Sequence, residues 1–425
     1  MIKGYIYFCI AMLVLYGDML KRVFPESALA VLYFMAGLLL VLMAFRGRKA
    51  SSTIGTDAKR VSFFAAFLVA IYALQLSTTF FSPFALAFSH FLYMAIPLSF
   101  IIVIHRYAPE FDLSRLATVF LILMIPINIV GLIQYLVNPG FLISTSYSAT
   151  GGIIDRNFFI GGYFSRFPSL FASADRYSAM ALMQFFFSVV LLAKDEKLSR
   201  KQYLWGGANV LMSFVALGIS GARSRILIAI VEVFFLGAIQ VIPMFNLKGV
   251  SAREGVRRLI VLFLGMVGVS AFFYLVYSPK AQDFPILAML NQTFDSGDVG
   301  VRINEALELS RPTEQVSLAG LGLGTQSLVP GKPGEFGLMS IWAESGLFWG
   351  IPLIISFMGM IFVLFKLSFK AAITGKGLFF VHYSFPLLIL IFGLLSGLTA
   401  AFELSTGVLL CCIVASVTRL TPQGT

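Results

Sequence analysis

The segment LATVFLILMIPINIVGLIQYLV, residues 116–137, contains 22 residues and no charged side chain. A helix needs about 20 consecutive, mostly apolar residues to cross the hydrocarbon core of a bilayer. Similar apolar runs recur along the whole 425-residue chain. We therefore predict an all-α integral membrane protein with about twelve transmembrane helices. The predicted spans lie near residues 4–19, 27–45, 61–80, 85–104, 116–137, 178–193, 203–219, 224–243, 259–277, 339–365, 379–396 and 401–418.

The composition supports this class. Hydrophobic residues make up 59% of the chain and charged residues only 12%, whereas soluble domains carry about 25% charged residues. The net charge of +11 would suggest a nucleic-acid partner in a soluble protein. Here the basic residues lie in short connections between apolar runs, so we interpret them as topology signals and expect no nucleic acid. The three cysteines lie within apolar runs and imply no disulfide framework.

The distribution of Lys and Arg predicts the orientation of the chain. Cytoplasmic loops of membrane proteins carry an excess of these residues. They concentrate here in the even-numbered connections, so we place those connections and both termini on the cytoplasmic side of a bacterial inner membrane. The residues are Arg46, Arg48, Lys49, Lys59 and Arg60 in the second connection, Arg106 and Arg115 in the fourth, Lys194, Lys197, Arg200 and Lys201 in the sixth, Lys248, Arg253, Arg257 and Arg258 in the eighth, and Lys366, Lys370 and Lys376 in the tenth.

The first apolar run resembles a signal peptide only superficially. Asp18, Lys21 and Arg22 follow it, where a signal peptide would have a small-residue cleavage site. We therefore expect residues 4–19 to be the first span.

Two odd-numbered connections are long. They cover about residues 138–177 and 278–338, and the charge rule places both on the periplasmic side of one polytopic domain that extends over residues 1–425. Long loops in compact proteins are usually functional. The second is expected to be partly helical, because VGVRINEALELS, residues 299–310, has the character of a short helix. We therefore expect the working surface on the periplasmic face.

A short external turn contains two arginines. Arg223 and Arg225 lie in ISGARSRIL, residues 219–227, between the seventh and eighth spans. Basic residues on this side oppose the positive-inside bias. One interpretation is that they bind an anionic group such as phosphate, for which Arg offers a planar fork of donors. The alternatives are contact with lipid headgroups or pairing with Glu232 deeper in the span.

Further charged residues lie in the two long loops. Arg166 and Arg176 are candidate ligand contacts in the first loop, and the alternative is an ordinary solvated loop with an ion pair to Asp175. Arg302 lies on the expected short helix of the second loop, ahead of GLGLGT, residues 320–325. That glycine run lacks a Walker lysine and a βαβ context. We interpret it as a turn that brings backbone close to substrate, or as a flexible bend.

Two carboxylates lie around the start of the tenth span, in GKPGEFGLMSIWAESGLFWG, residues 331–350. Glu335 precedes the span and Glu344 lies about two turns into it. A carboxylate there is either a general base or a charge favoured by the helix dipole. The histidines, His90, His105 and His382, are dispersed, and the external loops contain no acidic pair. We therefore expect no metal site and no cofactor.

The order and spacing of these residues resemble the superfamily of O-antigen ligases and O-antigen polymerases, which assemble bacterial polysaccharides. The family has a Ser-Arg turn between two spans, matched by Ser224-Arg225. It has an Arg before a Gly-x-Gly turn, matched by Arg302 and Gly320-Leu321-Gly322. Its next span contains a segment that Glu344-Ser345-Gly346-Leu347 matches. Ligases of the family have a His-Asn pair eleven residues before the glycine of that segment, where this chain has Glu335-Phe336.

The resemblance implies a GT-C-like, metal-independent, inverting glycosyltransferase. Its donor would be a glycan on undecaprenyl pyrophosphate. The implied catalytic residues are Arg225, Arg302 and the base Glu335, and the implied pyrophosphate or glycan contacts are Arg223, Arg166, Arg176 and Glu344.

The absence of the His-Asn pair favours a polymerase, whose acceptor is another lipid-linked repeat unit of an exopolysaccharide or lipopolysaccharide. A chain-length regulator is a possible partner of such an enzyme. The alternatives are a ligase that transfers to lipid A-core or protein, a flippase for lipid-linked oligosaccharides, and a non-catalytic scaffold.

Overall fold

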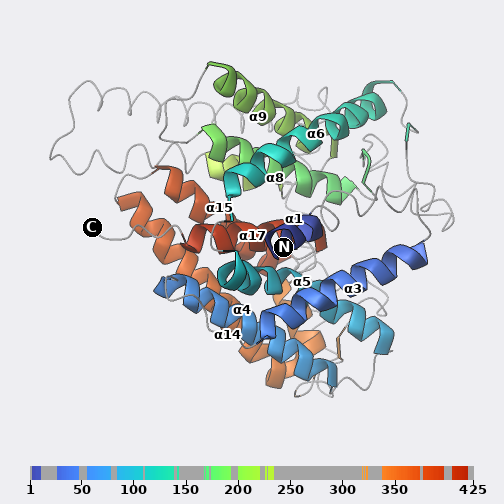
Figure 1. The fold of residues 1–425 in the computed structure, drawn as a ribbon, viewed down its shortest axis with the longest axis vertical. Helices are drawn as coiled ribbons and strands as arrows, with labels where there is room; N and C mark the ends of the chain where they lie inside the picture. Colours follow the sequence, from blue (N-terminus) through green and yellow to red (C-terminus); the bar gives the residue numbers. More distant parts are fainter. Residues whose placement is uncertain are drawn as a thin grey trace, which may run out of the picture. The chain divides into compact units, whose positions relative to one another are not determined.

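A computed structural model describes ten helices and, within the same residues, no strand (Figure 1). The described residues are 2–10, 26–46, 55–77, 84–108, 111–137, 141–142, 167, 169–171, 174–192, 200–220, 225–226, 228–233, 318, 320, 322–323, 337–373, 377–396 and 404–419. The chain divides into two compact units, and each is described by itself. The all-α prediction is thus confirmed for the described residues.

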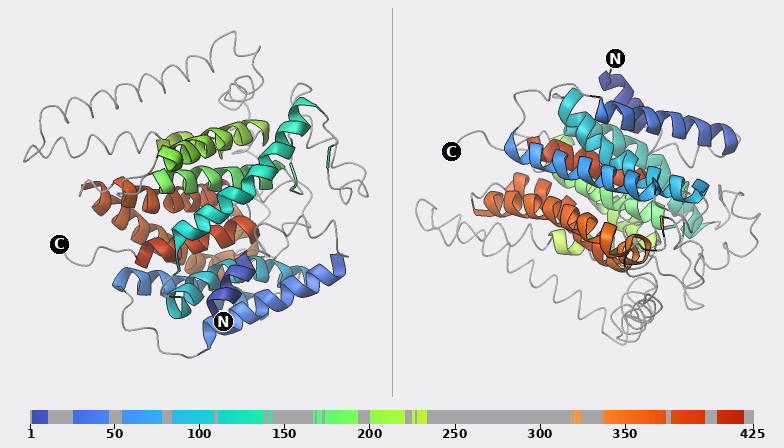
Figure 2. Two further views of the ribbon diagram at one scale, coloured as in Figure 1. Left: turned by 45° about the horizontal axis from the view of Figure 1, so that its top comes forward. Right: turned by 90° about the horizontal axis from the view of Figure 1, so that it is seen from below.

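Unit 1 comprises Met1–Leu113, Gly300–Leu367 and Pro386–Thr425. The helix α5 (Phe84–Tyr107) lies at its centre and packs against several other helices (Figure 2). Its residues from Leu98 to Ile104 are all buried. The unit therefore surrounds one apolar helix, and the partners of α5 are α1 (Ile2–Ile10), α3 (Glu26–Phe45), α4 (Thr56–Ser77) and α17 (Leu404–Arg419).

Several helix ends meet at one end of unit 1. Arg106 Nη1 donates to the carbonyl oxygen of Ala44 at 2.7 Å, and Arg419 Nη1 donates to that of Ala108 at 2.7 Å. These arginines lie in the fourth connection and at the C-terminal end of the last predicted span. The contacts join helix ends that the charge rule assigns to one side of a membrane. Which side this end faces stays a prediction.

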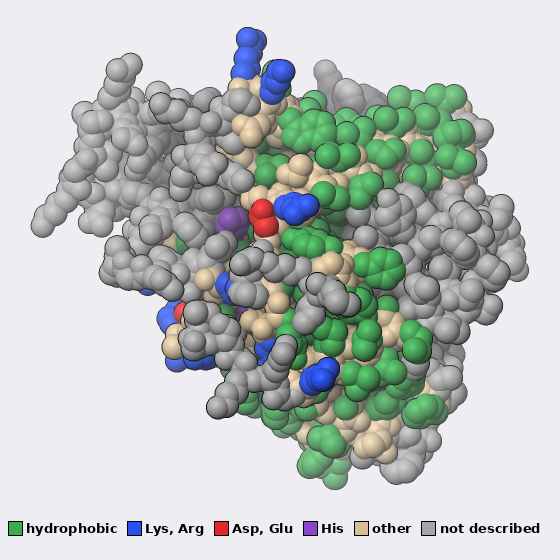
Figure 3. All heavy atoms as spheres, viewed as in Figure 1, with side chains coloured by type: hydrophobic (Ala, Val, Ile, Leu, Met, Phe, Trp, Pro, Cys, Tyr) green, Lys and Arg blue, Asp and Glu red, His purple; other side chains and the backbone are tan. Residues whose placement is uncertain are grey.

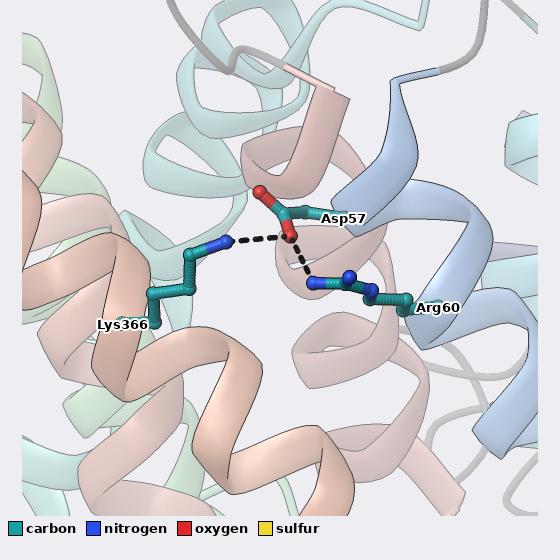
Figure 4. Close-up of polar contacts among 3 residues, drawn as sticks. All are labelled: Asp57, Arg60 and Lys366. Atoms are coloured by element: carbon teal, nitrogen blue, oxygen red, sulfur yellow. Dashed lines mark hydrogen bonds and ion pairs between the residues drawn. The ribbon is translucent and has the colours of Figure 1, made fainter.

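An ion-pair cluster lies near the start of α4, where Asp57 receives two cations (Figure 4). Lys366 Nζ from α14 (Gly337–Ile373) lies 3.4 Å from Asp57 Oδ1, and Arg60 Nη1 lies 3.5 Å from the same oxygen. Lys366 and Arg60 belong to the tenth and second connections of the predicted topology. The cluster therefore joins α4 to α14 at their basic ends.

Unit 2 comprises Ser114–Val299 and Ser368–Phe385. The helix α8 (Ala174–Leu192) packs along α9 (Arg200–Ser220) and contributes a nearly continuous buried surface. The Phe187 ring lies 5.2 Å from that of Phe120 on α6 (Leu113–Leu136), and the Phe186 ring stacks on Phe385 of α15 (Gly377–Ser396) at 4.2 Å. Aromatic packing of this kind holds α8 between its neighbours.

Buried polar side chains also link the helices of unit 2. Gln184 Nε2 on α8 donates to Asn209 Oδ1 on α9 at 3.0 Å. Asn128 Nδ2 on α6 donates to Gln184 Oε1 at 2.9 Å, and Tyr177 OH donates to Asn128 Oδ1 at 3.1 Å. Inter-helix hydrogen bonds are a common means of joining helices where the surroundings are apolar. This polar ladder therefore fixes α6, α8 and α9 relative to one another.

The outer surfaces of several helices are apolar. On α14, Phe348, Ile355 and Phe362 follow one another at seven-residue intervals, and Phe348 and Phe362 are 66% and 67% exposed. Figure 3 shows hydrophobic side chains over much of the face in view. An apolar stripe of this length is costly in water and suits contact with lipid.

Within the described residues, five helical segments are long and apolar enough to cross a membrane. Together with the exposed apolar surface, they indicate a membrane protein. Nine of the predicted spans coincide with described helices, and the first, residues 4–19, overlaps the described part of α1 only over residues 4–10. The number twelve stays a prediction, because the predicted spans near 259–277 and over most of 224–243 lie outside the described residues, as do most of the two long loops. The five segments are Thr56–Ser77, His90–Tyr107, Leu113–Leu136, Arg200–Ser220 and Glu344–Ala371.

Candidate functional site

The helix α14 is interrupted at Gly346. This glycine has φ 61° and ψ −166°, which breaks the helical path between Glu344 and Leu347. Positive φ is readily adopted only by glycine. The sequence places Glu344 two turns into an unbroken span, and the structure instead places it directly before an interruption. Such a break frees backbone groups that must find new partners at membrane depth.

Side-chain and backbone groups from elsewhere in unit 1 form hydrogen bonds with the backbone groups at this break. The carbonyl oxygen of Glu344 accepts hydrogen bonds from Gly322 N and from Gln75 Nε2, each at 3.0 Å. Phe348 N donates to the carbonyl oxygen of Leu318 at 3.0 Å, and Ser345 Oγ donates to Gln75 Oε1 at 3.2 Å. The break is therefore a built feature with its own hydrogen-bond partners.

The glycine turn, described at Gly320, Gly322 and Leu323, packs directly on this break. Gly320 and Gly322 have φ values of 76° and 100°. A Cβ atom on Gly320 would overlap the carbonyl oxygen of Glu344 and the backbone nitrogen of Gly346. Glycine is thus required here both for its backbone conformation and for the close approach of two chain segments. The turn therefore packs on α14. The sequence suggested either a turn close to substrate or a flexible bend, and neither interpretation included this packing.

A histidine and a carboxylate meet beside the break. His90 Nε2 on α5 lies 3.3 Å from Glu344 Oε2. The Glu344 side chain is 6% exposed and that of His90 is 22% exposed. Ionisable groups within membrane segments are costly, are usually paired, and often mark functional sites. The pair therefore makes this end of α5 and the α14 break a candidate functional site.

The arginine of the Ser-Arg turn lies in unit 2. Arg225 Nη1 donates a hydrogen bond to Ser178 Oγ on α8, the helix that also contains Arg176. Glu232, the alternative partner of Arg225, accepts a hydrogen bond from Ser384 Oγ at 2.6 Å, and its other oxygen has no hydrogen-bond partner among the described residues. In the described structure the Arg225 guanidinium hydrogen-bonds to Ser178, and the hydrogen bond described for Glu232 comes from Ser384.

Several predicted site residues are outside the described part of the chain. These are Arg166, Arg223, Arg302 and Glu335. Of the others, Glu344 belongs to the candidate site in unit 1, and Arg176 and Arg225 lie around α8 in unit 2.

Sequence reasoning missed His90, Gln75 and Ser178 as site residues. The signal available for Gln75 and for His90 was a polar side chain inside an otherwise apolar run. Within the described residues no cluster of three or more His, Cys, Asp or Glu side chains is arranged to hold a metal ion.

No protein-family model matches the chain, and a search of the curated proteins finds no match either. The fold and the site therefore define a structural class of protein, and they assign the chain to no family. The described chain is all-helical, its apolar helices indicate a membrane protein, and one helix is broken beside a pair formed by His90 and the buried Glu344.

Proposed function

We propose that the chain is a glycosyltransferase of a bacterial inner membrane, with cytoplasmic termini and a periplasmic active face. It transfers a glycan from undecaprenyl pyrophosphate to a sugar hydroxyl, most simply in the polymerisation of polysaccharide repeat units. The observation that supports the proposal best is the contact between the glycine turn and the α14 break. Two segments that carry the resemblance to the O-antigen polymerase and ligase superfamily, about 20 residues apart in sequence, pack together there.

The proposed reaction inverts the anomeric carbon. The acceptor hydroxyl oxygen forms a bond to that carbon, and the bond from the carbon to the pyrophosphate oxygen breaks. Undecaprenyl pyrophosphate leaves with the electron pair, and a base takes the hydroxyl proton. Arginine donors aimed at the developing negative charge lower the barrier, since charge-assisted bonds to phosphate are strong where water is excluded.

The roles proposed for individual residues follow from this reaction. Arg225 and Arg302 stabilise the leaving pyrophosphate, with Arg223, Arg166 and Arg176 as further anion contacts. The hydrogen bond that Arg225 donates to Ser178 supports its proposed role. It orients the guanidinium, and an oriented guanidinium loses less conformational freedom when it binds an anion. Glu335 is the base that the sequence proposes, and Glu344 is a proposed contact for the glycan.

The genetic test uses a strain that lacks this gene. It is complemented with wild type, Arg225→Ala, Arg302→Ala or Arg60→Ala, and the glycans are profiled. Arg60 is a matched control, because it pairs with Asp57 in the basic cluster of unit 1 and has no proposed role in transfer. We expect single repeat units to accumulate with the first two variants and normal chains with Arg60→Ala. Long lipid-linked chains that stay unattached would identify a ligase instead.

The second candidate function is a flippase for lipid-linked oligosaccharides. The broken helix α14 favours it, because transporters often bind substrate at discontinuous helices. The same strain separates the two candidates. Repeat units confined to the cytoplasmic face would establish the transporter, and units on the periplasmic face exclude it.

A further inference from the structure

The two side chains of the His90–Glu344 pair differ in solvent exposure, and this difference bears on which of them can reach a substrate. Glu344 is nearly enclosed, with 6% of its side chain exposed, whereas 22% of the His90 side chain is exposed. Nε2 is the ring nitrogen that faces the carboxylate, 3.3 Å from Glu344 Oε2. The more exposed group is thus an imidazole that has one ring nitrogen beside a carboxylate oxygen.

This arrangement matches the requirements of an oriented base. A general base must be reachable by the proton that it takes, and a second group usually holds the base in the correct tautomer and orientation. A carboxylate at Nε2 favours the proton on that nitrogen and leaves the lone pair on Nδ1. The positive charge that forms on the ring is then balanced by the same carboxylate.

The α14 break fixes the carboxylate for this task. The backbone of Glu344 is held through its carbonyl oxygen by Gly322 N and Gln75 Nε2. The half-helix that continues after Gly346 begins directly beyond it, and the N-terminus of a helix favours negative charge. The hydrogen bonds therefore fix the backbone of Glu344, and the helix N-terminus favours the negative charge of its side chain.

We propose that His90, oriented by Glu344, deprotonates the acceptor hydroxyl. This inference rests on the glycosyl transfer proposed above and replaces Glu335 as the base. The acceptor oxygen attacks the anomeric carbon as its proton passes to His90 Nδ1. The bond from that carbon to the pyrophosphate oxygen breaks, and undecaprenyl pyrophosphate leaves with the electron pair. The imidazolium then releases its proton to water.

A purely structural role would make the pair an inter-helix clamp between α5 and α14. The chain contains a matched example of such a clamp, since Asp57 and Lys366 join α4 to α14 at a similar distance of 3.4 Å. Loss of a clamp lowers the amount or stability of the protein. Loss of a base lowers the rate of transfer at an unchanged amount of protein, and the two effects are separable.

The test measures transfer in membranes from the deletion strain, using the strain's own lipid-linked repeat units as donor and acceptor. The full-length variants are His90→Gln, His90→Ala, Glu344→Gln, Glu335→Gln and the clamp control Asp57→Asn, each normalised to the amount of folded protein. We expect His90→Gln to lower kcat by about 10²–10⁴-fold with little change in KM. Glu344→Gln also lowers kcat, and Glu344→Asp keeps part of the kcat that Glu344→Gln loses. Added imidazole restores part of the transfer activity of His90→Ala.

Each other outcome overturns the proposal in a recognisable way. An active wild type with an equally active His90→Gln variant shows that glycosyl transfer is correct and His90 is not the base. If Glu335→Gln loses transfer activity and imidazole does not restore the activity of His90→Ala, the base is Glu335. A wild type that makes no product from periplasmic repeat units refutes the proposed function itself, and this inference with it.

Discussion

Replacing Gly320 with alanine tests the packing of the glycine turn on the α14 break. Gly320 has φ 76°, and a left-handed backbone costs a non-glycine residue about 1–2 kcal/mol. The added Cβ would also overlap two backbone atoms of α14, the carbonyl oxygen of Glu344 and the nitrogen of Gly346. Over-packing against groups that cannot rotate away costs about 1–3 kcal/mol. Gly320→Ala should therefore lower the free energy of unfolding by about 2–5 kcal/mol.

The assay is thermal unfolding of the purified protein in detergent. For a cooperative unit of the size of unit 1, about 1 kcal/mol changes Tm by about 2–4 °C. We therefore expect Gly320→Ala to lower Tm by about 4–20 °C. The control is Gly4→Ala in α1, where an added Cβ has no atom within 4 Å and should leave Tm unchanged or slightly raised. A Gly320→Ala protein as stable as wild type would refute the close approach of these segments.

Three further substitutions test other contacts. Gln75→Leu should lower the free energy of unfolding by about 1–3 kcal/mol in chemical denaturation, because the buried Glu344 carbonyl loses a donor, and an unchanged midpoint would contradict this. Asp57→Asn should cost at most about 1 kcal/mol, since its partners are half-exposed, and the effect should shrink in high salt. Ser178→Ala should reduce glycan transfer less than Arg225→Ala at equal protein levels, and an equal or larger loss would contradict a positioning role for Ser178.

Helix positions were the most predictable property of this chain. The thickness of a bilayer imposes a minimum apolar length, so each span leaves a strong local signal. The run 116–137, for example, coincides with α6 to within three residues at its start and one at its end. Both ends of α5 likewise lie within three residues of the predicted span.

The break in α14 was not predictable from the same signals. Gly346 is one of 37 glycines in the chain, and its positive φ depends on the glycine turn and Gln75 that pack against it. Hydropathy registers only an apolar run there, which is why the span was expected to be continuous. Tertiary contacts decide where a helix unwinds.

The pairing within the candidate site is also non-local. His90 and Glu344 are separated by more than half of the chain, and no periodicity connects them. Sequence reasoning selected Glu344 through its motif and assigned no role to His90. Only the packing of unit 1 identifies them as partners, because contact between distant segments depends on the register of whole helices. Arg60 and Lys366, which the charge rule assigns to one side of the membrane, both lie within 3.5 Å of Asp57 Oδ1, and the side itself stays a prediction.

The most direct test of glycosyl transfer is reconstitution. Purified full-length protein is placed in proteoliposomes with lipid-linked repeat units extracted from the deletion strain, and a metal chelator is present throughout. The account predicts that chains of two or more repeat units form and that undecaprenyl pyrophosphate is released in equal amount to the new bonds, and that both products are lost with Arg225→Ala. Repeat units that cross the bilayer without any new glycosidic bond would contradict it.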